Sequence, residues 1–430
     1  MRCRRSPAGR SRGASGPEAP GFRADASTAD AAPEGLTLLI SGRCNLACSY
    51  CYQDRRSGPG RMPWPIARAA LNFILERGRP PLTIAFSGGE PLLAKELLIR
   101  CVEFVERSAP RNDAVHFVLT TNGTLLTPES LAFLATRNLS LQLSFDGVEG
   151  AQGLRGAGTF TVLDGLLDRI RRDHPLFFRE RLRVHATVLR STIPLLARSA
   201  RYFLRKEVPE VRFFPATGLT GAGGAEEYAL LRRETERVAE ASLHHYERTG
   251  QVPVLFLRRP EGPRAPERAD GLICGAGWGK GLCVDAGGLA WSCPLFAGSL
   301  QSLSPLAAEA SRILQLGDVR SAALAERIAS LDRRSMSLRL LRGRGEKYSF
   351  LGPCRECEFL DECTLCPAAV SHSPGNEDPD RVPDFACAFA RATGEARRFF
   401  QTRIGGAQTR PETSEVLTSL RSRLANFLPP

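Results

Sequence analysis

The chain has 430 residues, a formal net charge of +12 and 43% hydrophobic residues. This length suits two domains better than one, and the hydrophobic content is enough for a sizeable core. Neither a run of 18 apolar residues nor an apolar N-terminal signal occurs, so we expect a cytoplasmic protein that does not span a membrane. The positive charge is mostly arginine scattered without interleaved aromatic residues, which favours a solvated surface. An acidic peptide or RNA partner is the alternative, and nucleic acid is the less favoured one.

Residues 1–34 are rich in Arg, Ala, Gly, Ser and Pro and predict a disordered tail. Over 35–220, short apolar strands then alternate with segments of helical spacing. Strands are predicted at 37–40, 82–86, 115–120, 139–145, 183–189 and 211–214, and helices at 63–77, 92–106, 128–137, 159–173 and 193–206. Six strand–helix repeats are fewer than a full barrel needs, so we predict an α/β fold with a partial (β/α)6 TIM-like barrel.

The remainder of the chain is predicted to hold three further segments. Residues 221–270 form a linker, with a long helix at 226–248 and a proline-broken loop at 257–270. Residues 271–394 are dense in cysteine and poor in apolar residues, so this segment is expected to need metal to fold. Residues 395–430 predict a polar, helical C-terminal tail.

Three of the 13 cysteines, Cys44, Cys48 and Cys51, follow the first predicted strand with the spacing C-x3-C-x2-C. Three thiolates this close can hold three irons of a [4Fe–4S] cluster and leave the fourth iron open to a substrate or cofactor. The tight spacing and the missing export signal favour metal binding over disulfides. In parallel α/β barrels active sites lie at the carboxyl ends of the strands, where this loop is placed.

A second motif, Gly88-Gly89-Glu90-Pro91, ends the second predicted strand. Together with the cysteine loop it resembles the radical S-adenosylmethionine (SAM) superfamily over residues 36–216. The resemblance implies that the three cysteines bind the cluster, that the open iron chelates SAM, and that the GGEP turn contacts the SAM amino group. The glycines allow close backbone approach, and Glu90 offers a negative charge to an ammonium group.

The same resemblance implies four further SAM-binding residues. Ser144 and Asp146, in the run after the fourth strand, would lie near the SAM ribose. Arg155 would meet the SAM carboxylate, although its spacing is one residue short, and Tyr50 would pack near the adenine. The alternative for each residue is an ordinary strand-end turn or a core aromatic.

The C-terminal cysteines resemble a SPASM domain, a module that binds two auxiliary [4Fe–4S] clusters. The resemblance assigns the distal cluster to Cys354, Cys357, Cys363 and Cys387. It assigns the proximal cluster to Cys274, Cys293 and Cys366, with Cys283 as the candidate fourth ligand. The alternative is that Cys283 is a core thiol, which would leave the proximal cluster with an iron open to a substrate thiolate. The pair Cys363 and Cys366 departs from the usual C-x3-C spacing, and a tetrahedral zinc site is the rival interpretation.

The two resemblances imply an oxidoreductase that cleaves SAM to a 5′-deoxyadenosyl radical and takes hydrogen from a peptide or protein side chain. We therefore expect maturation of a ribosomal peptide by crosslinking or oxidation, with a reductant such as flavodoxin or ferredoxin. About 35 residues precede the first strand, so any leader peptide is expected to be recognised by the barrel, by the SPASM region or by a separate leader-peptide-binding protein. The alternatives are an RNA or small-metabolite substrate, a non-catalytic metal-binding module, or sulfatase maturation. Sulfatase maturation is disfavoured because Pro294 stands where that subgroup carries an aspartate. The sequence identifies no catalytic acid or base.

Overall fold

A computed structural model describes residues 32–53, 60–108, 114–217, 224–259, 272, 274–297, 304–363 and 365–405. The predicted tail at 1–34 and the loop at 257–270 lie almost wholly outside the described residues. Most of the predicted C-terminal tail at 395–430 also lies outside them.

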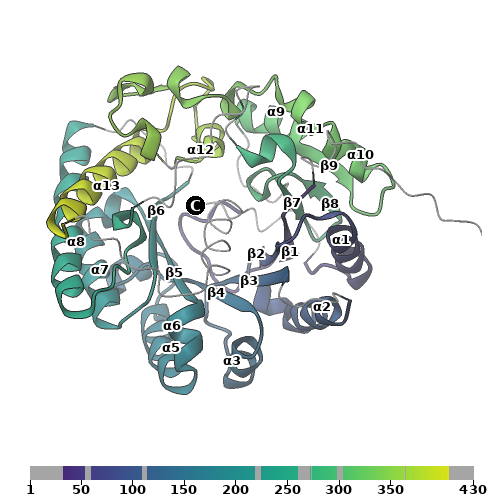
Figure 1. Ribbon diagram of the computed structural model, residues 1–430, viewed down its shortest axis with the longest axis horizontal. Helices are drawn as coiled ribbons and strands as arrows, with labels where there is room; N and C mark the ends of the chain where they lie inside the picture. The colour runs from purple at the N-terminus through teal and green to yellow at the C-terminus, as the bar shows by residue number, and fades with distance from the viewer. Residues whose placement is uncertain are drawn as a thin grey trace, which may run out of the picture.

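The molecule is organised around one nine-stranded sheet with the strand order β6-β5-β4-β3-β2-β1-β7-β8-β9. Its strands are β1 Gly35–Ser41, β2 Leu82–Gly88, β3 Val115–Thr121, β4 Leu139–Ser144, β5 Leu182–Val188, β6 Val211–Pro215, β7 Gly281–Val284, β8 Leu289–Trp291 and β9 Gln315–Asp318. The first six strands pair in parallel with their neighbours in the chain. They curve into an open arc, so the predicted α/β fold with a partial barrel is confirmed (Figure 1).

Helices cover the outer face of this arc in Figure 1. The helices of the barrel are α1 Trp64–Arg77, α2 Lys95–Ser108, α3 Pro128–Ala135, α4 Glu149–Gln152, α5 Thr159–Asp173, α6 Pro175–Arg181, α7 Leu196–Arg205 and α8 Ala225–Thr249. The later helices are α9 Pro305–Leu314, α10 Leu324–Ala329, α11 Leu331–Ser335, α12 Pro367–Ser371 and α13 Asp384–Arg403, and β10 Tyr348–Ser349 pairs with β11 Gly352–Pro353. The loops after the parallel strands therefore meet at one end of the arc.

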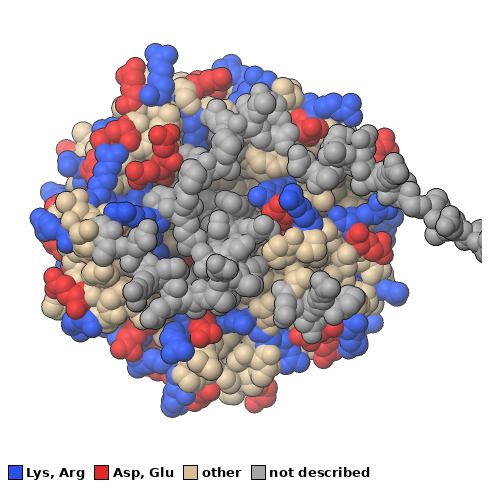
Figure 2. All heavy atoms as spheres, in the orientation of Figure 1, with Lys and Arg blue, Asp and Glu red and all other residues tan. Residues whose placement is uncertain are grey.

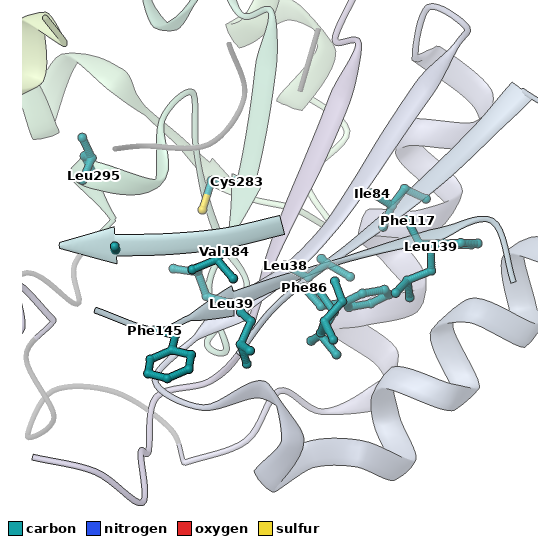
Figure 3. Close-up of a cluster of buried hydrophobic side chains, with 14 of the residues drawn as sticks. Leu38, Leu39, Ile84, Phe86, Phe117, Leu139, Phe145, Val184, Cys283 and Leu295 are labelled. Atoms are coloured by element: carbon teal, nitrogen blue, oxygen red, sulfur yellow. The ribbon is translucent and has the colours of Figure 1, made fainter. Parts of the chain in front are cut away.

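The core lies between the sheet and these outer helices. All seven residues of β1 are buried, as expected for a parallel strand covered on both faces. Leu38, Phe86 and Phe117 come from adjacent strands and pack together (Figure 3), with 6.2 Å between the centres of the two phenylalanine rings. This packing holds the neighbouring strands together, so that the ends of β1 and β2, which carry the cysteine loop and the GGEP turn, lie beside each other.

The cysteine-rich segment begins as a continuation of the barrel sheet. β7 pairs in parallel with β1, and β8 and β9 follow in antiparallel pairing. At the other end of the segment α13 packs along α8 (Figure 1). The expected boundary between residues 394 and 395 falls inside α13, because its buried residues Ala388, Ala392 and Ala396 continue one apolar face across it. The proposed division into domains otherwise stays a prediction.

The described helices and surface bear on two expectations from composition. Within the described ranges, no helix has the length and apolar content needed to cross a bilayer. Over the described residues visible in Figure 2, lysine and arginine are interspersed with aspartate and glutamate. On this face, the described surface therefore carries positive and negative side chains mixed together.

A buried ionic cluster lies where β5 and β6 begin. Glu210 is 3% exposed and faces three guanidinium groups, with N–O distances of 2.8 Å to Arg212, 3.0 Å to Arg258 and 3.4 Å to Arg183. Burial acts to raise the pKa of Glu210, but the three arginines outweigh it and hold the pKa well below its usual range. The ionised carboxylate is therefore part of the folded structure.

We expect the free energy of unfolding contributed by Glu210 to fall as the pH is lowered. A carboxylate with a depressed pKa in the folded state contributes stability above its unfolded pKa, and loses it as the pH falls toward the folded value. The difference in unfolding free energy between wild type and Glu210→Gln should shrink by about 1–3 kcal/mol between pH 7 and pH 3. Urea denaturation across this range measures it, and a difference that stays constant would contradict the assignment.

Candidate active site

The three cysteines of the C-x3-C-x2-C loop follow β1 and are each half-buried. The backbone N–H of Ser49 donates to the carbonyl of Leu154 (3.0 Å), and that of Cys51 donates to the carbonyl of Cys48 (3.2 Å). Burial raises the pKa of the Cys48 thiol; Cys51 and Cys44 add to this effect, and Arg155 opposes it. The three thiols thus lie close enough to influence one another, and their donor set fits the three protein-bound irons of a [4Fe–4S] cluster.

The GGEP turn holds the start of this loop through its backbone. Gly89 N–H donates to the carbonyl of Ser41 (2.7 Å), and Glu90 N–H donates to the carbonyl of Arg43 (2.8 Å). A Cβ at Gly88, where φ is +125°, would lie 2.3 Å from the Ser41 oxygen, and one at Gly89 would lie 2.3 Å from the Arg43 oxygen. The two glycines are therefore required for the contact between the turn and the cysteine loop.

Replacing Gly89 with alanine is expected to lower SAM cleavage about tenfold, because the added methyl group must displace the backbone beside Cys44. Gly60→Ala is the matched control, since its Cβ would meet the side chain of Arg43, 2.8 Å from Nε, which can swing away. Formation of 5′-deoxyadenosine and iron content measure both variants. Activity of Gly89→Ala within twofold of wild type would show that the close approach is dispensable.

Glu90 is almost wholly buried, with 1% of its surface exposed. Its Oε1 accepts from Thr121 Oγ1 (2.6 Å) and from the N–H of Leu92 (3.0 Å), and its Oε2 accepts from the N–H of Asn122 (2.9 Å). Burial raises the pKa of this carboxyl, against the lowering effect of the three hydrogen bonds. Glu90 therefore joins the end of β2 to the end of β3, and its contact with the SAM ammonium stays a prediction.

Three of the predicted SAM-binding residues, Tyr50, Asp146 and Arg155, meet in one cluster around the buried carboxylate of Asp146. Arg155 Nε and Nη2 donate to the two oxygens of Asp146 (3.0 and 2.8 Å), and Tyr50 donates its hydroxyl to Asp146 Oδ2. Burial raises the pKa of Tyr50, and the side chain of Asp146 also raises it. This cluster ties the cysteine loop to the ends of β4 and β5.

The backbone of β5 completes this cluster through a residue to which sequence reasoning gave no role. The N–H of Thr187 donates to Asp146 Oδ1 (2.8 Å).

Ser144 at the end of β4 lies beside His185 of β5 in the sheet register, and its place near the SAM ribose stays a prediction. Burial lowers the pKa of His185 to about 3, with Arg212 adding to the effect, so this imidazole is neutral. The alternation in 183–188 is the signal that places Arg183, His185 and Thr187 on one face of the strand.

The four cysteines assigned to a distal cluster lie around one cavity of about 260 Å³. They are Cys354, Cys357, Cys363 and Cys387. Burial raises the pKa of Cys387 to about 12, and its sulfur lies 3.1 Å from Ser349 Oγ. The cavity is also lined by four basic residues, Arg344, Lys347, Arg391 and Arg397, and by two acidic ones, Glu356 and Glu362. Four thiols beside this excess of positive charge suit an anionic thiolate-bound cluster.

The cysteines assigned to a proximal cluster form a separate group. Burial raises the pKa of Cys274 to about 12, and the neighbouring Cys366 adds to the effect. Burial likewise raises the pKa of Cys293 well above its usual value, and the neighbouring thiols of Cys274 and Cys366 add to this effect. In the described part of the chain, no three His, Cys, Asp or Glu side chains gather closely enough for a single metal ion.

Cys283 occupies a different environment from these three residues. It lies within β7 opposite Thr37 of β1 and Trp291 of β8, is 0% exposed, and packs in the hydrophobic cluster of Figure 3. Burial raises the pKa of its thiol. Its role as the fourth proximal ligand stays a prediction.

Comparison with known proteins identifies the class of this site. Residues 38–195 match the Radical SAM superfamily. The predicted radical SAM domain is therefore confirmed over these residues. The family implies a [4Fe–4S] cluster and SAM as cofactors, and the thiols at the end of β1 fit that cluster.

Two curated relatives resemble the N-terminal part of the chain. The cysteine-type anaerobic sulfatase-maturating enzyme of Clostridium perfringens is 26% identical over 193 residues, which is 41% of this chain and 51% of the relative. The GTP 3′,8-cyclase of Parasynechococcus marenigrum is 33% identical over 135 residues, which is 30% of this chain and 38% of the relative. The chain thus spans between about a third and a half of the length of such relatives.

Two solved structures share the fold more widely. Native anSMEcpe with bound AdoMet and Cp18Cys peptide has a TM-score of 0.66 at 16% identity, covering 87% of this chain and 100% of that one. Streptococcus suis SuiB bound to precursor peptide SuiA has a TM-score of 0.54 at 16% identity, covering 83% and 76%. The common fold therefore extends beyond the barrel into the cysteine-rich segment.

Proposed function

We propose that this enzyme reductively cleaves SAM and abstracts hydrogen from a peptide or protein side chain. The observation that carries the proposal is the cysteine loop at the end of β1, held by the backbone of the GGEP turn and by the cluster of Tyr50, Asp146 and Arg155. When bound, the cluster and SAM supply one-electron reduction and the 5′-deoxyadenosyl radical.

The chain's own residues have three tasks in this proposal. Cys44, Cys48 and Cys51 hold the cluster, and Gly88 and Gly89 bring the backbone of the turn against the loop. Glu90 fixes the ends of β2 and β3 from a buried position. Ser144, Asp146, Arg155 and Tyr50 border the SAM site at the ends of the next strands, and a preorganised site of this kind excludes water from the radical.

We further propose that the C-terminal segment is a SPASM domain with two auxiliary [4Fe–4S] clusters. The cavity lined by four cysteines supports the distal cluster, and the separate group of Cys274, Cys293 and Cys366 supports the proximal one. These clusters offer a route for the electron left on the product. A reductant such as flavodoxin or ferredoxin would supply the SAM-binding cluster.

Two observations favour a peptide over other substrates. The structures of anSMEcpe and SuiB that share this fold over most of the chain hold peptides. The resemblance to GTP 3′,8-cyclase is limited to 30% of this chain, and it supports a small-molecule substrate as the second candidate. Sulfatase maturation, suggested by the relative from Clostridium perfringens, is disfavoured by Pro294 beside Cys293.

The test uses the full chain, reconstituted with iron and sulfide without oxygen. With dithionite and SAM we expect 5′-deoxyadenosine, and about 12 irons per chain if three clusters form. Peptides encoded beside this reading frame are then added, and mass loss of about 2 Da from one of them marks oxidation or crosslinking. Absence of 5′-deoxyadenosine would refute the enzymatic proposal, and about four irons with stoichiometric zinc would refute the auxiliary clusters.

A further inference from the structure

Asn122 follows β3 directly and contacts both Glu90 of the GGEP turn and Cys44 of the cysteine loop. It is 7% exposed, and its backbone N–H donates to Glu90 Oε2 (2.9 Å). Its amide nitrogen Nδ2 lies 3.9 Å from the sulfur of Cys44, within reach of an N–H···S contact. Cys44 also accepts from the backbone N–H of Leu46 (3.4 Å).

The hydrogen bonds around Asn122 fix which end of its amide faces the sulfur. Its Oδ1 accepts from the backbone N–H of Thr124 (3.0 Å), which can only donate, and from Thr124 Oγ1 (2.7 Å). Its Nδ2 donates to Asn45 Oδ1 (2.9 Å), and Asn45 Nδ2 donates to Thr124 Oγ1 (2.8 Å). Because the backbone N–H of Thr124 must meet the amide oxygen, the NH2 group is the end of the Asn122 amide that points at Cys44.

We infer that Asn122 donates to the cluster-bound thiolate of Cys44 and raises the reduction potential of the SAM-binding cluster. The inference rests on the proposed function, because it requires a cluster on Cys44. A donor at a thiolate stabilises negative charge, and the reduced cluster carries one more negative charge than the oxidised one. Asn122 is thus a positioning residue, which acts through a cluster ligand and not on the substrate.

The experiment is a redox titration of the anaerobically reconstituted full chain, followed by electron paramagnetic resonance. The SAM-binding cluster is identified as the signal that changes when SAM is added. For Asn122→Ala, we expect the ratio of reduced to oxidised cluster at a fixed potential to fall about threefold to tenfold. A tenfold change corresponds to about 59 mV for one electron.

Asn45→Ala and Thr124→Ala are the matched controls, because each opens the same ring but leaves the N–H···S contact at Cys44 in place. Both are expected to keep the ratio within twofold of wild type. An equal shift in all three variants, or no shift in Asn122→Ala, would overturn the inference. An equal shift would mean that the amide acts only by anchoring the loop. The absence of a shift would mean that the amide has no effect on the potential of the cluster.

Asn122→Leu gives a second reading if the alanine variant loses its cluster. Leucine fills the volume of the amide without adding a charge and offers no donor to Cys44, so we expect a lower potential than wild type. Loss of the cluster from both variants, with Asn45→Ala intact, would overturn the inference in favour of a role in assembly. A wild-type chain without a SAM-responsive signal would instead refute the proposed function itself.

Discussion

Replacing Cys44, Cys48 and Cys51 together with alanine is expected to reduce formation of 5′-deoxyadenosine to an undetectable level. No other thiols among the described residues follow β1 within this loop, so nothing there can replace the three ligands. The iron content should fall by about four per chain, because one four-iron cluster is lost. The fold should persist, since the three side chains are half-buried in a loop and contribute little to the core. Far-ultraviolet circular dichroism and iron analysis accompany the activity assay.

Cys101→Ala is the control for this result. Cys101 is 0% exposed within α2 and packs in the core of the barrel, where the lost sulfur leaves a small cavity costing about 1 kcal/mol. SAM cleavage and iron content of this variant should match wild type within experimental error. Residual 5′-deoxyadenosine in the triple variant at more than a tenth of the wild-type rate would place the reducing cluster elsewhere.

The barrel could be predicted from the sequence because its strands are buried on both faces. Such strands are short runs rich in apolar residues, as in 37–40, and the helices between them show a different period. The motifs at the strand ends were predictable for a related reason: a parallel sheet gathers loops that are far apart in sequence at one edge. The GGEP turn and the cysteine loop meet there, as the register of β1 and β2 requires.

The pairing of β7 with β1 could not be predicted from the sequence. β7 has four residues and lies about 240 residues beyond β1, and its short apolar pattern does not indicate which sheet edge it joins. The same limit applies to the surroundings of Cys283, because its place in the core follows from this pairing of β7, and its role as a ligand stays a prediction. Spacing identifies candidate ligands, whereas the direction of each side chain depends on pairing between distant strands.

The hydrogen-bond partners of the polar site residues also could not be predicted from the sequence. The motif predicts that Glu90 faces SAM, which stays a prediction, but it gives no sign of the three donors from the chain itself that bind the carboxylate. Asn122 lies in a run that the sequence marks as a strand end, without any sign of its contact with Cys44. Such contacts arise only when loops from two or three strands close around one another.

Replacing Asp146 with alanine is expected to destabilise the enzyme and to lower SAM cleavage at least a hundredfold. The carboxylate has 1% of its side chain exposed and receives donors from Arg155, Tyr50 and the N–H of Thr187. Its removal leaves the guanidinium of Arg155, with 10% of its side chain exposed, without its ionic partner. Breaking a buried ion pair in this way costs about 3–5 kcal/mol. Thermal unfolding of the anaerobic protein and the rate of 5′-deoxyadenosine formation measure the two effects.

Asp146→Asn separates the charge from the shape. The amide oxygen can still accept from Thr187 N–H, but the charge that holds Arg155 is lost, so we expect an intermediate loss of stability. The double variant Asp146→Ala, Arg155→Met removes both charges and should recover much of the unfolding free energy, because no buried cation is left without a partner. It should not recover SAM cleavage if Arg155 also binds the SAM carboxylate. If the double variant recovers both activity and stability, the guanidinium of Arg155 is not needed to bind SAM. Its role would then be structural, as the ionic partner of Asp146.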